Sequence, residues 1–568
     1  MSLGEPLEYD LRIRGGLVVD PANGIDEECR DLWISDGRMV SPPNDPDIAC
    51  RRTIDARGYV VMPAGVDVHC HIAGSKVNGA RLMRPEDHRD AVIARRPGFR
   101  SGTVGSTPTT FATGYLYTGL GYGTALDASI PALLARQAHH EFDDTPILDK
   151  AFLVLMGNNH LVLEKVRDRD AAGLRNVVAW LLGAAKGYGV KVVNPGGVER
   201  WKEGCGNVVS LDDVVESYGV TPRSIMESLA TAIDELRLPH PMHLHGLNLG
   251  LPGNWRTTLE TLQALDGHRL HLAHVQFHSY GDEEGKSPAF GSRVADLASH
   301  VNDHDGVTVD VGQVIFGDTT SMTADGAVGQ FLAGVTGRKW LNLDVEAETG
   351  CGVVPITYSD RNAVHALQWA IGLEWFLSVD DPWKLALSTD HPNGGSFLAY
   401  PRIVAWLMSQ ARRAETLATL PASIAGRTPL SDLSREYTLA EIAIITRAAP
   451  ARMMGLSHKG HLGPGADADI TIYSPDDDRE RMFGFPRYVI KSGEVVLDDG
   501  DLKMAPPGTT LYTAPEYDRG IEVSIRRRFD AEGTIRFENL TVDLEEIARP
   551  CTGPPVGKAG QSDAGGAP

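Results

Sequence analysis

The chain has 568 residues, enough for a large buried core and for more than one domain. Its formal net charge of −21 argues against nucleic acid as a partner, because phosphate would be repelled. No run approaches the roughly 20 apolar residues that span a bilayer, and the first residues lack the apolar segment of a secretory signal. We therefore expect a cytoplasmic protein that binds neither nucleic acid nor membrane.

The six cysteines are scattered, without the C-x-x-C spacing of iron–sulfur clusters or zinc knuckles. The chain also lacks a Gly-rich dinucleotide-binding fingerprint. Nothing in the sequence therefore predicts oxidation chemistry within this chain.

Residues 1–60 contain short runs of alternating apolar and polar residues separated by Gly and Pro, which is typical of strands joined by turns. The same pattern returns in residues 456–545. In residues 61–455, helical periodicity alternates with short apolar runs, as in VVAWLLGAAKGYG followed by VKVVN. This predicts an α/β fold, a TIM-like (β/α)8 barrel with a small composite β-sandwich domain from both chain ends. Residues 546–568 are rich in Pro and Gly and are predicted to be disordered.

The strongest local motif is GVDVHCHIAGSK, in which an apolar strand leads into His69 and His71. Side chains two apart on a strand point the same way, so two imidazoles can converge on one metal ion where the strand ends. An isolated H-x-H is equally compatible with two buried, hydrogen-bonded histidines. The turn at Met62–Gly65, which leads straight into the strand, favours the metal site.

More histidines occur at the ends of later predicted strands, in PMHLHG and HLAHVQFH. Helical crossovers should place these two strands side by side, so that their carboxyl ends share one rim of the barrel. We predict His243 and His274 as the ligands. His245 is as compatible with a core or supporting role as with ligation, and His278 with contact to substrate.

Asp390 follows another apolar run and precedes a Gly/Pro loop, where a carboxylate can ligate a metal and accept a proton from water. An Asp before a turn is also a common cap. Lys191 lies within an apolar strand, although an unpaired ammonium is costly to bury. It either forms a buried ion pair, for instance with Asp390, or is neutral enough to react with CO₂, giving a carbamate that can bridge two metal ions.

In this order the motifs resemble the amidohydrolase superfamily, with H-x-H after the first barrel strand, Lys at the fourth, His at the fifth and sixth, and Asp at the eighth. Longer strings give a narrower resemblance, to the A subunit of formylmethanofuran dehydrogenase and of its bacterial counterpart, the formyltransferase/hydrolase complex. It extends roughly over residues 8–545 and is carried by HIAGSKVNGARLMRPEDH, YGVKVVNPGG, PMHLHGLNLG, HVQFHSYG, VDVGQVIFGDTTSMTADG, ETGCGVVP and STDHPNGGSF.

The resemblance implies two zinc ions, an N6-carboxylysine at Lys191, and the other subunits of such a complex as partners. It also implies the reaction, in which the N-formyl amide of a methanofuran-type C1 carrier is hydrolysed to formate and free amine, or formed from them. Asp390 would transfer the proton from water to the leaving amine, and Asn194 or His278 would hold the substrate. The expected metal ligands are His69, His71, Lys191, His243, His274 and Asp390.

A cluster of arginines follows the first metal motif and is unexpected on so acidic a chain; its members are Arg81, Arg84, Arg89, Arg95, Arg96 and Arg100. Because Arg pairs bidentately with carboxylates, we hypothesise that some of them, Arg81 and Arg84 first, bind an anionic, glutamate-bearing tail of the carrier. A solvated face or a contact with a partner protein explains the cluster equally well.

Two other functions remain open. The same ligands would serve a cyclic-amide hydrolase such as a hydantoinase or dihydroorotase, because a fold does not determine a substrate. Alternatively, the chain is a non-catalytic scaffold for partner subunits, although such a chain would be expected to lose its ligands.

Overall fold

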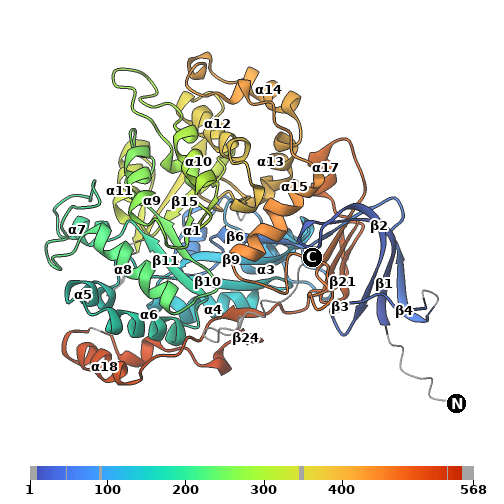
Figure 1. Cartoon of the computed structure of the whole chain (residues 1–568), viewed down its shortest axis with the longest axis horizontal. Helices are drawn as coiled ribbons and strands as arrows, with labels where there is room; N and C mark the ends of the chain where they lie inside the picture. The colour runs from blue at the N-terminus through green and yellow to red at the C-terminus, as the bar shows by residue number, and fades with distance from the viewer. Residues whose placement is uncertain (1–8, 46–47, 88–91, 344–350, 534, 553–568) are drawn as a thin grey trace, which may run out of the picture.

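A computed structural model describes residues 9–45, 48–87, 92–343, 351–533 and 535–552. It shows a barrel and, at one side of it, a second β-sheet that holds the N-terminal strands (Figure 1). Among the described residues, no helix combines the length and the apolar character needed to cross a membrane.

Within the described residues, eight parallel strands of a ten-stranded sheet form the barrel. The sheet nearly closes on itself, because a parallel bridge joins Cys70 to His391 and the N–H of His71 donates to the carbonyl of His391 at 2.7 Å. In order around the barrel the strands are β6 (Gly65–Cys70), β9 (Tyr122–Ile130), β10 (Asp149–Leu155), β11 (Gly189–Val193), β12 (Met242–His245), β13 (Leu270–Leu272), β14 (Val307–Asp310) and β18 (Leu385–Ala386).

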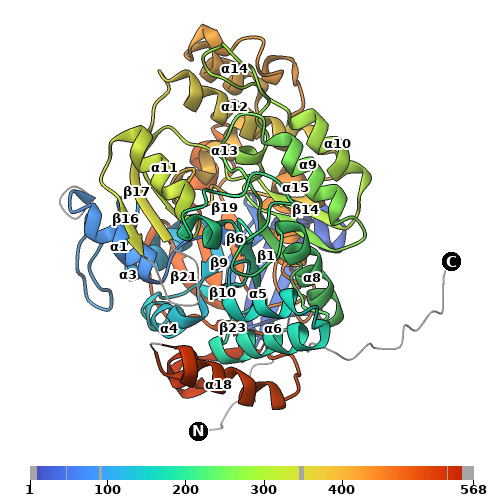
Figure 2. The same ribbon diagram turned by 90° about the vertical axis from the view of Figure 1, so that its left-hand side faces the viewer.

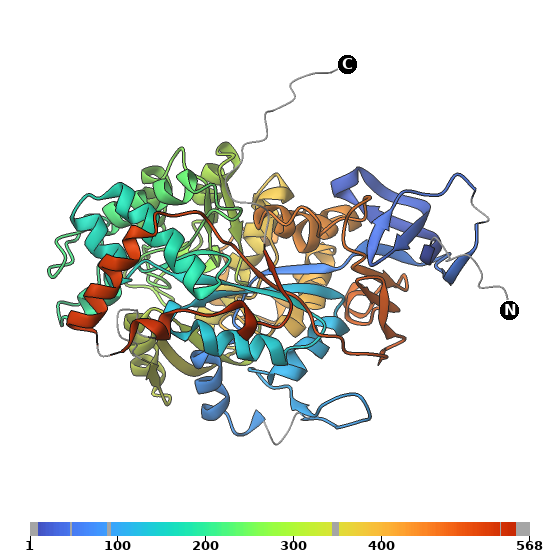
Figure 3. The ribbon, with the colours of Figure 1, turned by 90° about the horizontal axis from the view of Figure 1, so that it is seen from below.

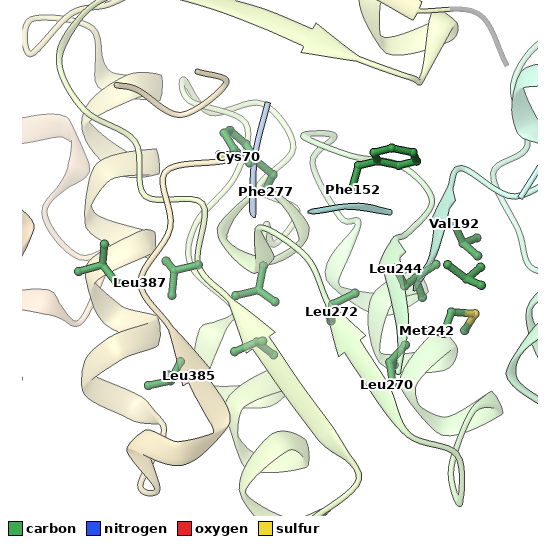
Figure 4. Close-up of a cluster of buried hydrophobic side chains, with 14 of the residues drawn as sticks. Cys70, Phe152, Val192, Met242, Leu244, Leu270, Leu272, Phe277, Leu385 and Leu387 are labelled. Atoms are coloured by element: carbon green, nitrogen blue, oxygen red, sulfur yellow. The ribbon is translucent and has the colours of Figure 1, made fainter. Parts of the chain in front are cut away.

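Helical crossovers cover the outside of this sheet (Figure 2). Apolar and polar side chains alternate along β12 and β13. Figure 4 shows Met242 and Leu244 of β12 and Leu270 and Leu272 of β13 within one buried apolar cluster. The residues between them, among them His243, therefore point into the barrel. The crossover helices are α3 (Thr110–Gly119), α4 (Ala135–Asp144), α5 (His160–Arg167), α6 (Ala171–Ala185), α7 (Gly197–Lys202), α8 (Pro222–Glu235), α9 (Trp255–Ala264), α10 (Val294–Asp303) and α12 (Ala363–Ser378).

The second sheet is built from both ends of the chain, as predicted, and Figure 3 shows its blue N-terminal strands close to the orange C-terminal ones. The two ends meet where β5 pairs antiparallel with β19. Alternating apolar residues such as Leu11, Ile13 and Ile472 form its own core. Its strands are β1 (Tyr9–Asp20), β2 (Ile25–Ser35), β3 (Arg38–Val40), β4 (Cys50–Asp55), β5 (Val60–Pro63), β19 (Ile470–Tyr473), β20 (Tyr488–Lys491), β21 (Glu494–Asp498) and β22 (Asp501–Leu502).

An insertion between β14 and β18 forms a separate three-stranded antiparallel sheet of β15 (Gly317–Thr323), β17 (Cys351–Tyr358) and β16 (Leu341–Leu343). Helix α11 (Gly326–Thr336) packs on β17 and begins at Asp325, whose side chain accepts the N–H of Val328. It ends at Gly337, whose positive φ of 61° glycine adopts without strain.

The last part of the chain differs from the expected organisation. Residues up to 545 were predicted to belong to the sandwich, but β23 (Thr510–Tyr512) pairs with barrel strand β10, and α18 (Gly520–Glu532) contacts α6. The expected tail is also partly ordered, since β24 (Pro550–Thr552) pairs with β23. Edge strands of this kind are recruited by hydrogen bonding that composition does not reveal. Residues 553–568, and the first three residues of ETGCGVVP, lie outside the described residues.

The remaining helices connect these parts. They are α1 (Ser75–Met83), α13 (Tyr400–Leu407), α14 (Gln410–Ala418), α15 (Leu439–Ala443), α16 (Ala449–Met453) and α17 (Arg479–Gly484).

Candidate metal centre

The carboxyl ends of the barrel strands border a cavity of about 580 Å³, a size that accommodates a small organic ligand. Its outer wall is apolar and includes Val328, Phe331, Leu332 and Val335 of α11. Among the described residues, the His, Lys and Asp side chains that border it are His69, His71, Lys191, His245, His274, His365 and Asp390.

Three of the predicted ligands, His69, His71 and Asp390, meet at the carboxyl-end rim of the barrel. Oδ1 of Asp390 lies 3.1 Å from Nε2 of His69 and 2.9 Å from Nε2 of His71. All three side chains are buried, and one ligand atom from each lies within 4.8 Å of the others. Two imidazole nitrogens and a carboxylate oxygen at this spacing form a donor set that suits zinc.

Carboxylates also support the two imidazoles from behind. Nδ1 of His69 lies 2.8 Å from Oδ2 of Asp310, and Nδ1 of His71 lies 3.5 Å from Oδ1 of Asp127. Burial would raise the pKa of Asp310, but the neighbouring His69 and His271 lower that pKa below its ordinary value. Such carboxylates fix the orientation of a ligating imidazole and increase its basicity.

Sequence reasoning missed Asp310, although a signal was present. Asp310 ends the apolar run VTVD of β14, as Asp390 follows the apolar run of β18. A carboxylate at the end of a barrel strand is a candidate for the site in both places.

Lys191 is buried on β11, and its Nζ has no hydrogen-bond partner among the described residues. Burial lowers the pKa of Lys191 to about 7. Within the described part of the chain no carboxylate oxygen lies within 4 Å of Nζ, so the geometry does not support the ion-pair alternative with Asp390. An amine that is about half neutral at pH 7 and borders the cavity fits the carbamate alternative.

The histidine expected as a ligand on β12 is placed differently. His243 is not among the described residues that border the cavity, and its two ring nitrogens face His240 and His69. His245, two residues further along the same face, does border the cavity, with its ring centroid 4.7 Å from that of His274. Alternation in the sequence predicts which side chains share a face of a strand, but not how far along the strand the site lies. The geometry favours His245, which is nearer the carboxyl end of β12. His245 is therefore the better placed candidate at the cavity. Ligation by His243 remains a prediction, since ligand atoms of His69, His243 and Asp310 also lie within 4.8 Å of one another.

His274 lies two residues after the end of β13 and borders the cavity at the rim where it was predicted. Its backbone adopts a positive φ of 35°, and its N–H donates to Oδ1 of Asp310 at 3.1 Å. Gly312 allows this close packing, because a Cβ at that position would lie only 2.4 Å from Cβ of His274. The chain around His274 is therefore held by the same carboxylate that supports His69.

The predicted substrate contacts lie outside the described wall of the cavity. Nδ2 of Asn194 donates to Oδ1 of Asn207 at 2.9 Å. His278 is fully buried and stacks on His274 at a centroid distance of 5.4 Å, so it supports the site from outside the cavity. Substrate contact by either residue remains a prediction.

Arg81 and Arg84, the two arginines predicted to bind a carrier tail, form hydrogen bonds and ion pairs with other residues of the chain. Arg81 donates to Oδ1 of Asn78 at 3.1 Å, and Arg84 donates to the carbonyl of Thr319 at 3.2 Å and pairs with Asp87 at 3.3 Å. Both are buried or nearly so, and neither is among the described residues that border the cavity. The geometry does not support their binding of a carrier tail, and Arg89 lies outside the described residues. The arginine that does border the cavity is the exposed Arg338, which follows α11.

A parallel barrel with histidines, a buried lysine and carboxylates at the carboxyl ends of its strands defines the class of this protein. The chain belongs to the amidohydrolase family, whose model matches residues 52–497.

Two relatives are similar over nearly the whole chain. Protein FwdA of Methanocaldococcus jannaschii is 46% identical over 556 residues, which cover 94% of this chain and 96% of the relative. The A subunit of the formyltransferase/hydrolase complex Fhc of Methylorubrum extorquens is 41% identical over 518 residues, which cover 90% and 92%. These similarities confirm the narrower resemblance that the sequence motifs indicate.

A crystal structure confirms the fold. One chain of the formyltransferase/hydrolase complex FhcABCD from Methylorubrum extorquens, solved with methylofuran, matches with a TM-score of 0.89 and 37% identity. The match covers 96% of this chain and 100% of that chain.

Proposed function

We propose that this chain is the hydrolase subunit of a formyltransferase/hydrolase or formylmethanofuran dehydrogenase complex. It hydrolyses the linear N-formyl amide of a methanofuran-type C1 carrier to formate and free amine, or catalyses the reverse reaction. The observation that carries the proposal is the similarity over 90% or more of the chain to FwdA and to the A subunit of Fhc, together with a complete set of potential ligands at the barrel rim.

The described residues fit two zinc ions. His69, His71 and Asp390 provide one set of donors. His245 and His274, whose ring centroids lie 4.7 Å apart at the cavity, would provide a second. Lys191 lies at the same rim as a buried amine without a partner among the described residues, so as an N6-carboxylysine it would provide a further anionic ligand. Bound zinc would lower the pKa of water and polarise the formyl oxygen.

Asp390 is positioned to move a proton during hydrolysis. Oδ1 accepts from Nδ2 of Asn393 at 3.0 Å, which holds the carboxylate at the cavity, 2.9 Å from Nε2 of His71. Burial opposes ionisation, but His69 and His274 lower the pKa of Asp390 well below its ordinary value. The carboxylate therefore starts ionised, accepts the proton of the attacking water and donates it to the nitrogen of the leaving amine.

The outer cavity suits a carrier with an apolar segment next to the formyl amide. Phe331 and Val335 of α11 border it while 53% and 69% exposed, so a ligand that covers them gains hydrophobic contact. Arg338 follows on the same wall and offers a guanidinium to an acidic group further along the carrier.

The decisive experiment uses the chain purified with its native partner subunits. We expect formate release from an N-formyl aminomethylfuran carrier and none of the ring opening of hydantoin or dihydropyrimidine that a cyclic-amide hydrolase would catalyse. Metal analysis should give about two zinc ions per chain. Ring opening without formate release would overturn the proposed substrate, and less than one zinc ion per freshly purified chain would support the scaffold alternative.

A further inference from the structure

A line of three histidines extends from His69 into the barrel. Nε2 of His243 lies 3.2 Å from Nδ1 of His69, and Nδ1 of His243 lies 3.0 Å from Nε2 of His240. The line ends where Nδ1 of His240 lies 2.9 Å from the backbone carbonyl of Met453. The three rings are at most 1% exposed.

The carbonyl at the end of the line determines the direction of every hydrogen bond in it. A carbonyl only accepts, so Nδ1 of His240 carries the proton and Nε2 of this neutral imidazole is an acceptor. His243 must then donate through Nδ1, which leaves its Nε2 as an acceptor that faces Nδ1 of His69. Nδ1 of His69 therefore also carries a proton, which it shares with Oδ2 of Asp310 at 2.8 Å.

The consequence appears at the opposite side of the His69 ring. A neutral imidazole with a proton on Nδ1 has a lone pair on Nε2. That nitrogen lies 3.1 Å from Oδ1 of Asp390, on the side of the predicted ligand cluster.

We propose that His240 and His243 are positioning residues that hold His69 as the tautomer able to bind metal through Nε2. The inference rests on the proposed metal centre. Because the line ends on a backbone carbonyl, it orients hydrogen bonds and does not conduct protons. This role also accounts for two buried histidines on the inner side of the barrel that do not border the cavity.

The end of the line is rigidly held. Met453 ends α16 and packs with Val66 and Val68 in the apolar interior of the barrel. The next carbonyl, of Met454, accepts the hydroxyl of Tyr188 at 2.7 Å. The acceptor that directs His240 therefore belongs to the core.

The test compares His240→Leu with the matched control His139→Leu. His139 is also fully buried and bonded to a carbonyl, that of Ala185 at 2.9 Å, but it lies on α4 outside the site. We expect zinc affinity, measured by chelator competition, to fall about 10- to 100-fold in His240→Leu and to stay unchanged in His139→Leu. Gln carries both a donor and an acceptor, so His240→Gln should restore most of the affinity.

His243→Gln gives a second test if His240→Leu does not fold. A positioning residue should leave about two zinc ions bound at saturating zinc, with the affinity reduced, whereas loss of a direct ligand would remove one ion. Unchanged zinc affinity in folded His240→Leu, or an equal loss in both leucine variants, would overturn the inference. Failure of the wild-type protein to bind zinc would instead refute the proposed metal centre.

Discussion

The carboxylate of Asp310 lies 2.8 Å from Nδ1 of His69, although 241 residues separate the two in the chain. The same carboxylate accepts the backbone N–H of His274 and contacts His271 at 3.1 Å. One side chain at the end of the seventh barrel strand thus orients residues from the first and sixth strands.

The first prediction concerns this carboxylate. Asp310→Asn keeps the size of the side chain but removes the charge that supports His69, so we expect zinc affinity to fall roughly 10- to 100-fold. Chelator competition measures this, with the exposed Asp296→Asn on α10 as the control. Equal affinities in the wild type and Asp310→Asn would show that Asp310 only stabilises the fold.

The second prediction concerns Lys191. If its amine carries a carbamate, metal-free protein should take up zinc poorly in CO₂-depleted buffer and fully after bicarbonate is added. Lys191→Ala should bind zinc weakly in both conditions. Lys150→Met is the control, because Lys150 is equally buried but its Nζ donates to the carbonyls of Phe142 and Thr145. Zinc uptake independent of CO₂ in the wild type would contradict the carboxylated lysine.

The third prediction separates the two histidines of β12. His245→Ala should reduce bound zinc at saturation to about one ion per chain, because a direct ligand is lost. Elemental analysis after gel filtration measures the stoichiometry. The assignment from geometry would fail if His245→Ala kept both ions while His243→Gln lost one.

The fourth prediction concerns pH and stability. Glu374 on α12 is buried and hydrogen-bonded to Ser292 and Thr428, and burial raises its pKa from 4.5 to about 7. A carboxyl group whose pKa is raised in the folded state contributes stability that is full below pH 4.5. This stability is lost as the pH rises from 4.5 through 7, because over this range the carboxyl ionises more readily in the unfolded state. The loss is on the order of 3 kcal/mol.

Glu374→Gln should remove this dependence. Relative to the wild type, its melting temperature should rise between pH 5 and pH 8, whereas the exposed Glu415→Gln should follow the wild type at both pH values. A difference between Glu374→Gln and the wild type that stays constant with pH would refute the assignment.

The fifth prediction concerns the outer cavity. Arg338→Ala should raise KM for a carrier with a carboxylate tail about two- to fivefold, since an exposed ion pair contributes roughly 0.2–1 kcal/mol. KM for a tail-less N-formyl amine should not change. Arg84→Ala should lower thermal stability instead, because its guanidinium holds the carbonyl of Thr319 and Asp87. A selective KM effect in Arg84→Ala alone would restore the original hypothesis for the arginine cluster.

The order of motifs along the chain was enough to predict the barrel and its rim. Apolar alternation identified β12 and β13. The predicted site residues lie in or just after apolar runs of this kind, which form barrel strands in the structure. Parallel strands with helical crossovers bring their carboxyl ends to one edge, so His69, His274 and Asp390 had to be neighbours once the fold was known.

Tertiary structure decided the role of each individual side chain, because that role depends on how deeply the side chain is buried and on partners that are distant in the sequence. Which histidine of β12 borders the cavity is decided by the packing of the barrel, because the strand register alone pairs Lys191 with His243 rather than with His245. The burial of Arg84 follows from the insertion that carries Thr319. Asp310 and His240 acquire their roles only through contacts across the barrel. Local sequence specifies on which face of a strand a side chain lies, whereas the packing of distant strands determines which residues that side chain contacts.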